Sequence, residues 1–109
     1  MKTITANELK RMLHDDVLLV NTLSEDNFER TRIEGAINIP QDSPDFVRRV
    51  EDAAGGRAVV VYCANQQCDS STKAAQKLEA AGFANAYDFA PGAKGWEEAG
   101  EKLAANATS

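Results

Sequence analysis

The residues best suited to chemistry in this chain are two cysteines, Cys63 and Cys68. Cys63 directly follows the strongest strand pattern, residues 58–62, and a helix is predicted to begin near Ser70. In that position, loop N–H groups and the helix dipole would favour a thiolate, so a lowered cysteine pKa is expected. A thiolate can accept sulfane sulfur, and the same N–H groups would stabilise a persulfide anion. Cys63 is therefore the candidate catalytic residue; the alternative is a buried cysteine serving as a small hydrophobic side chain.

The loop after Cys63 is polar and short. The residues expected to form a cradle around a substrate are Ala64, Asn65, Gln66, Gln67, Cys68, Asp69 and Ser70. If the loop curls, Cys68 could reach the Cα separation of ~5.5–6 Å that a disulfide prefers. It could then resolve a persulfide on Cys63 or protect Cys63 from overoxidation. The alternative is that Cys68 only fills the base of the loop. Trp96 is expected in the core or in the wall of the cleft, because aromatic side chains bury a large area.

The elements that must position this loop alternate between strand and helix. Strands are predicted at residues 17–20, 35–40, 58–62 and 86–89. Helices with capping signals are predicted at residues 5–13, 24–30, 43–54 and 70–81, and a turn at 91–92 leads to the segment around Trp96. This order predicts an α/β fold with an open, mostly parallel sheet of about five strands and helices on both faces. Ligands of such sheets gather at the carboxyl ends of the strands, where Cys63 lies.

Composition limits the partners that this chain is expected to have. Its 109 residues fit one domain, and 43% of them are hydrophobic, enough for one core. The net charge of −5 argues against nucleic-acid and membrane partners. We find no signal peptide and no apolar segment near the ~18 residues of a membrane span, so we expect a cytoplasmic protein. Two cysteines and one histidine are too few for structural zinc, and no metal or cofactor is expected.

Several motifs, in the same order along nearly the whole chain, resemble those of single-domain rhodanese-like sulfurtransferases. The matching positions are residues 19–23, Phe28, Ile33 and 35–40 upstream, residues 62–63, Ser71, Ala74, Ala75, Leu78, 81–83 and Asn85 in the middle, and Gly92, Trp96 and Gly100 near the end. The resemblance implies a rhodanese-like domain over residues 1–103, and residues 104–109 are expected to form a flexible tail. It also implies a persulfide on Cys63, and we expect a small sulfur-containing donor, a thiol or protein acceptor, and a monomer or weak homodimer.

The sequence departs from the family pattern where the donor would bind. Thiosulfate-using members usually bring a cation into the active loop, whereas this loop has none and adds Asp69. A dianionic donor would lose on the order of a kcal/mol there. We therefore expect polysulfide, or a protein or low-molecular-weight persulfide, rather than thiosulfate. Arg32, where the family commonly has His, could reach the cleft and replace the missing cation. A phosphatase of similar fold would need Arg in place of Asp69 to clamp phosphate.

Three function classes follow from these observations. The first is a sulfurtransferase or sulfane-sulfur carrier that uses Cys63. The second is a non-catalytic binding or regulatory module, which the altered first motif favours: Asn21 and Leu23 stand where the family usually has Asp and Arg. The third is a dithiol redox protein that uses Cys63 and Cys68.

Overall fold

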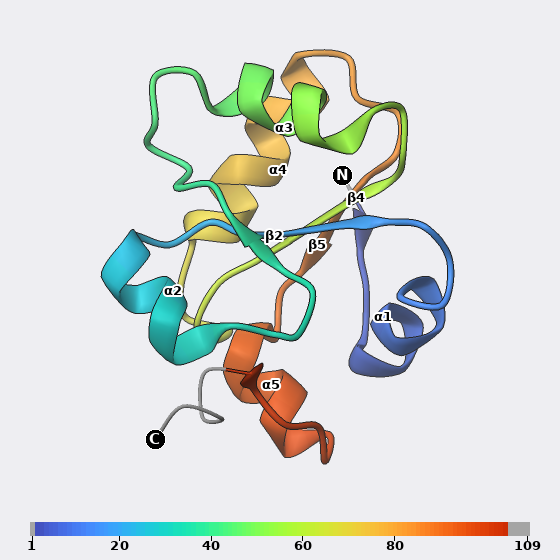
Figure 1. Cartoon of the computed structure of the whole chain (residues 1–109), viewed down its shortest axis with the longest axis vertical. Helices are drawn as coiled ribbons and strands as arrows, with labels where there is room; N and C mark the ends of the chain where they lie inside the picture. Colours follow the sequence, from blue (N-terminus) through green and yellow to red (C-terminus); the bar gives the residue numbers. More distant parts are fainter. Residues whose placement is uncertain (1, 105–109) are drawn as a thin grey trace.

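A parallel five-stranded sheet runs through the computed structural model, which describes residues 2–104 (Figure 1). In chain order its elements are β1 (Lys2–Thr3), α1 (Ala6–Met12), β2 (Leu18–Asn21), α2 (Glu25–Thr31), β3 (Ile37–Asn38), α3 (Phe46–Ala54), β4 (Val59–Tyr62), α4 (Ser70–Ala80), β5 (Ala86–Phe89) and α5 (Gly92–Glu98). The strand order is β1-β5-β4-β2-β3, and every neighbouring pair is parallel. The predicted fold class is confirmed.

β4 lies at the centre of the sheet, between β5 and β2, and all four of its residues are buried. Val59 and Val61 pack with side chains of α3 and α4 on one face. Val60 and Tyr62 pack with side chains of α1 and α5 on the other. Figure 1 shows the two helix layers on opposite sides of the strands. A strand covered on both faces has to be apolar throughout, which explains the continuous run at residues 58–62.

Three elements differ from the sequence prediction. α3 begins at Phe46 rather than near Ser43, because the Phe46 N–H donates to the Ser43 carbonyl (3.1 Å) in a turn with Pro44 at its second position. β1 was not predicted, because two residues are too short for a periodic pattern. α5 was not predicted either, since its seven residues include Gly92 and Gly95, and glycine is a poor helix former.

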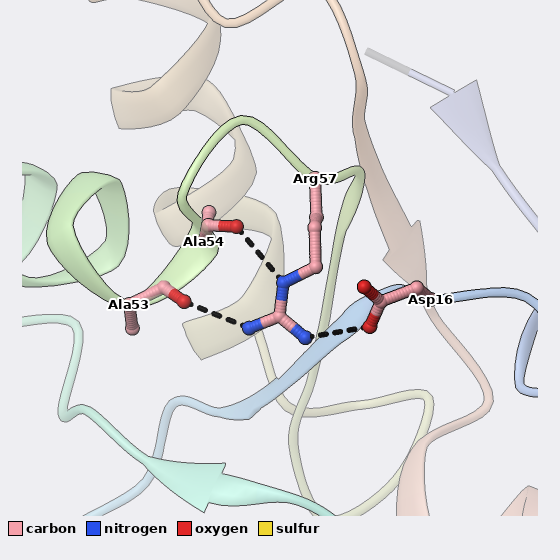
Figure 2. Close-up of polar contacts among 4 residues, drawn as sticks. All are labelled: Asp16, Ala53, Ala54 and Arg57. Carbon is pink, nitrogen blue, oxygen red and sulfur yellow. Dashed lines mark hydrogen bonds and ion pairs between the residues drawn. The ribbon is translucent and has the colours of Figure 1, made fainter.

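Arg57 closes the C-terminal end of α3, in the turn that leads to β4 (Figure 2). Its guanidinium donates to the carbonyls of Ala54 (2.9 Å) and Ala53 (2.8 Å), which lack partners within the helix. The same group pairs with Asp16 (2.9 Å), whose side chain is 84% exposed. The contacts with the carbonyls join the helix end to the start of β4.

Of the predicted tail, only Ala104 falls within the described residues, and its N–H donates to the Arg32 carbonyl (2.7 Å). Residues 105–109 lie outside them. Among the helices of residues 2–104, none combines the length and the apolar character needed to cross a membrane.

Candidate active site

The loop of residues 63–69 connects β4 to α4, and Thr22 at the end of β2 holds both ends of this loop. Thr22, just after β2, donates from its N–H (3.1 Å) and its hydroxyl (3.2 Å) to the Tyr62 carbonyl. The hydroxyl of Ser70, the first residue of α4, donates to the Thr22 carbonyl (3.1 Å). The two ends of the cysteine loop are therefore held at the carboxyl edge of the sheet, as predicted for Cys63.

The start of α5 forms the floor beneath the loop. The N–H groups of Ala93 and Lys94 donate to the carbonyls of Cys63 (2.8 Å) and Ala64 (2.9 Å). Gly92 allows this contact, because a Cβ at that position would stand 2.6 Å from the Cys63 carbonyl oxygen and 2.8 Å from the Asn65 nitrogen. Only glycine permits so close an approach of the two backbones.

Asn65 curls the loop upon itself. Its side-chain Oδ1 accepts from the N–H groups of Gln67 (3.0 Å) and Cys68 (3.1 Å), and its carbonyl also accepts from the Cys68 N–H (3.2 Å). Asparagine side chains commonly bond to the backbone two or three residues on in this way. The curl brings Cys68 back towards Cys63.

The Cys63 thiol is fully buried in this loop conformation. Its Sγ lies 3.4 Å from the Cys68 carbonyl oxygen and 3.9 Å from that of Asn65, so its S–H faces acceptors. The Ser71 hydroxyl is 3.6 Å from the same sulfur. Burial, followed by a hydrogen bond with the Cys68 side chain, raises the pKa of Cys63 to about 11, although the N–H and hydroxyl of Ser71 oppose that rise.

The expectation of a lowered pKa and an inward ring of N–H groups is therefore wrong for this loop conformation. The sequence placed Cys63 correctly at the strand end, but it could not show that two loop carbonyls would point at the sulfur. Of the groups that the structure describes around Sγ, Ser71 supplies those that favour a thiolate. A buried thiol facing carbonyl oxygens keeps its proton, because the charged form loses solvation there.

The other loop residues surround the cysteine unevenly. Ala64, Asn65, Cys68 and Ser70 are half-buried, whereas Gln66, Gln67 and Asp69 are exposed. Asp69 pairs with Lys73 (3.3 Å) one turn along α4. The predicted cradle is thus formed in this conformation mainly by backbone carbonyls and by Ser71.

The two predicted cleft residues, Arg32 and Trp96, each contact an aromatic ring. The Arg32 guanidinium stacks 5.6 Å from the centre of the Phe28 ring. Trp96 is 5% exposed and meets Phe89 edge to face, with ring centres 6.1 Å apart. Trp96 therefore belongs to the core beneath the loop, which was one of its two expected places.

Sequence reasoning did not assign roles to Ser71 and Lys94. Ser71 appeared only as a family position, although a hydroxyl in the first turn of a helix that follows a cysteine loop is a usable signal. Lys94 projects from α5 into a hollow of about 190 Å³ beside Gln66 and Gln67, which Glu98 also lines. Within residues 2–104 it forms no ion pair. No sequence signal indicated it, because the loop and α5 meet only in the folded chain.

Residues 2–104 contain no group of three or more His, Cys, Asp or Glu side chains placed to hold a metal ion. Both cysteines are free thiols. The chemistry that this site offers is that of a thiol at the end of a central strand, beside the first turn of a helix.

The fold and this cysteine loop define the class of protein. A model of the rhodanese-like domain matches residues 5–99. The chain therefore belongs to the rhodanese-like domain family. No curated protein sequence matches it.

Solved structures share the fold. The rhodanese-like domain of an Anabaena protein superposes with a TM-score of 0.80 at 20% identity, covering 100% of this chain and 84% of that one. A rhodanese-related protein from Thermoplasma volcanium gives 0.77 at 20% identity, covering 94% and 96%. A thiosulfate sulfurtransferase from Pseudomonas aeruginosa gives 0.81 at 25% identity over 94% of this chain. This chain spans 20% of the length of that enzyme.

Proposed function

We propose that this protein is a sulfurtransferase or sulfane-sulfur carrier that forms a persulfide on Cys63. The observation that carries the proposal is the place of this thiol, at the carboxyl end of central strand β4 and against Ser71 in the first turn of α4, within a rhodanese-like domain. The Ser71 N–H and hydroxyl favour a negative charge on the sulfur, and the α4 N-terminus adds to this. Both features remain on α4 when the loop changes conformation.

The proposed reaction begins with a movement of the loop. A fully buried sulfur cannot meet a donor, and with a pKa of about 11 roughly one thiol in ten thousand is ionised at pH 7. In the open loop that we propose, the Asn65 and Cys68 carbonyls turn away from Sγ and water reaches it, which reduces the desolvation that raises the pKa of Cys63. The Cys63 thiolate then attacks the terminal sulfur of a sulfane donor, and the shortened donor leaves with the electrons of the broken S–S bond. An acceptor thiol later takes the outer sulfur and regenerates Cys63.

Polysulfides and persulfides are the donors that we favour over thiosulfate. Asp69 is exposed in the loop, and its partner Lys73 lies outside the loop, on α4. Lys94 of α5 lines the hollow beside Gln66 and Gln67 and is not among the groups that act on the Cys63 thiol. A dianionic donor at Cys63 is therefore weakly compensated. The reducing cytoplasm is the compartment that we propose, because it keeps both thiols free.

Intact mass tests the proposal. The Cys68→Ser variant, which keeps Cys63 as its single thiol, is incubated separately with polysulfide and with thiosulfate and then freed of excess donor. We expect added sulfur after polysulfide, much less after thiosulfate, and none in the Cys63→Ser/Cys68→Ser double variant. Equal sulfur on the double variant, or none with either donor, would overturn the assignment.

A second candidate is a non-catalytic binding module of the same fold. The observation that favours it is the covered, neutral Cys63 thiol, which packs as a small buried side chain would. The same mass measurement separates the two functions. A folded protein that takes up sulfur from neither donor, at pH 7 or at pH 9, would favour the binding module.

A further inference from the structure

We infer that Cys68 is a resolving thiol, which converts a persulfide on Cys63 into a Cys63–Cys68 disulfide and releases sulfide. This inference rests on the proposed function, because it needs the persulfide to form first. It adds a second, redox outcome to the same loop: without an acceptor thiol, the protein reduces the sulfane sulfur instead of keeping it.

The curl of the loop is the first observation in favour of this step. Three hydrogen bonds to Asn65, two of them from the Cys68 N–H, fold residues 65–68 into a tight turn. As a result the Cys68 carbonyl oxygen lies 3.4 Å from Cys63 Sγ. The turn therefore places the backbone of Cys68 against the sulfur of Cys63, so the curled loop keeps the two cysteines as neighbours in space.

The two side chains also differ in access. Cys63 is fully buried, whereas Cys68 is half-buried and so keeps contact with solvent. Solvent can therefore reach Cys68 while its backbone stays against the sulfur that would carry the persulfide. A cysteine that only filled the base of the loop would be buried there.

The step balances without an external oxidant. The Cys68 thiolate attacks Sγ of the protonated persulfide, an Sγ–Sγ bond forms, and the bond between Sγ and the outer sulfur breaks. The outer sulfur leaves as HS⁻ with the bonding electron pair. The two cysteines are oxidised together by two electrons, and the sulfane sulfur is reduced to sulfide. Two equivalents of a small thiol return the disulfide to the dithiol and become a disulfide themselves.

The experiment compares wild type, Cys68→Ser and a surface control, Gln76→Ser, in one turnover. The control changes an exposed side chain of α4 that lies outside the cysteine loop. Each reduced protein receives one equivalent of polysulfide with no free thiol present. Released sulfide is measured against a protein-free blank, and the alkylated protein is analysed by intact mass and peptide mapping.

We expect wild type and Gln76→Ser to form an internal Cys63–Cys68 disulfide and to release about one sulfide per chain. Cys68→Ser should instead retain the sulfur on Cys63 and release at least about tenfold less sulfide. Sulfur retained equally by wild type and Cys68→Ser, with no disulfide, would overturn the inference and leave the proposed function standing. If neither protein gains sulfur and no disulfide forms, both the inference about Cys68 and the proposed persulfide on Cys63 are overturned. A disulfide between chains, growing with protein concentration, would overturn the internal step alone.

Discussion

Replacing Gly92 with alanine tests whether α5 holds the cysteine loop in place. Gly100→Ala is a matched control, because both glycines have positive φ, +68° and +92°, but a Cβ at Gly100 would meet nothing within 4 Å. The left-handed backbone costs alanine about 1–2 kcal/mol in either place. Backbone strain alone would make Gly92→Ala the milder change, since its φ is nearer the value that other residues adopt.

Contact with the cysteine loop makes Gly92→Ala the more destabilising of the two changes. A Cβ on Gly92 would stand 2.6 Å from the Cys63 carbonyl oxygen, 2.8 Å from the Asn65 nitrogen and 2.9 Å from the Ala64 carbonyl carbon. Overpacking of this kind adds about 1–3 kcal/mol. We expect Gly92→Ala to lose about 2–5 kcal/mol of unfolding free energy in urea, and Gly100→Ala about 1–2 kcal/mol.

A Cβ on Gly92 should also push the cysteine loop away from α5 and so expose the Cys63 thiol. Iodoacetamide under native conditions should label Cys63 faster in Gly92→Ala than in wild type, with Gly100→Ala unchanged. Peptide mapping distinguishes this label from one on Cys68. Equal losses of stability in the two variants, together with unchanged labelling of Cys63, would refute the claim that Gly92 sets the loop conformation.

Three further predictions follow from the described contacts. Because burial raises the pKa of Cys63 to about 11, the alkylation rate of Cys63 in wild type should keep rising about tenfold per pH unit past pH 9, and a rate that levels off by pH 9 would contradict this. Between pH 9 and 11 the unfolded chain loses the thiol proton before the folded protein does, so the unfolding free energy of wild type should fall relative to that of Cys63→Ser. Arg57→Ala should cost about 1–2 kcal/mol in urea unfolding, because the Ala53 carbonyl loses its side-chain donor and the Ala54 carbonyl keeps only the backbone N–H of residue 57. Asp16→Ala should cost less than about 0.5 kcal/mol, and equal losses would place the effect in the exposed ion pair. Tyr62→Phe should cost about 1–3 kcal/mol by thermal unfolding, because the buried Tyr62 hydroxyl accepts from the Ile33 N–H and donates to the Thr31 carbonyl. Tyr87→Phe is the control and should be near neutral, because the Tyr87 hydroxyl makes no hydrogen bond among residues 2–104. Equal effects of the two changes would contradict the role of the Tyr62 bonds.

The sheet and most helices could be predicted because their signals are local. The continuous apolar run at residues 58–62 has one stable setting, a central parallel strand, and the capping box of Thr5 and Glu8 is present as predicted. The start of α3 was mistaken because Ser43 and Pro44 suit a turn as well as a helix start. β1 is held by its pairing with β5, which no local pattern reveals.

The site was predictable in position but not in detail. A cysteine between the central strand and a helix must lie at the carboxyl edge of the sheet, so Cys63 could be placed from the sequence. The direction of the Asn65 and Cys68 carbonyls depends on backbone rotations within the loop, which residue types do not determine. The support from α5 through Gly92 is a contact between segments far apart in the chain.

Cyanide-reactive sulfur on Cys63 tests the central claim most directly. Cys68→Ser protein is loaded with polysulfide, freed of excess donor, and treated with cyanide, and the thiocyanate formed is counted per chain. We expect about one thiocyanate per chain, and only background when Cys63 is also replaced with serine. Background thiocyanate from both proteins, with the fold of each intact by circular dichroism, would contradict the assignment of Cys63 as the residue that carries sulfur.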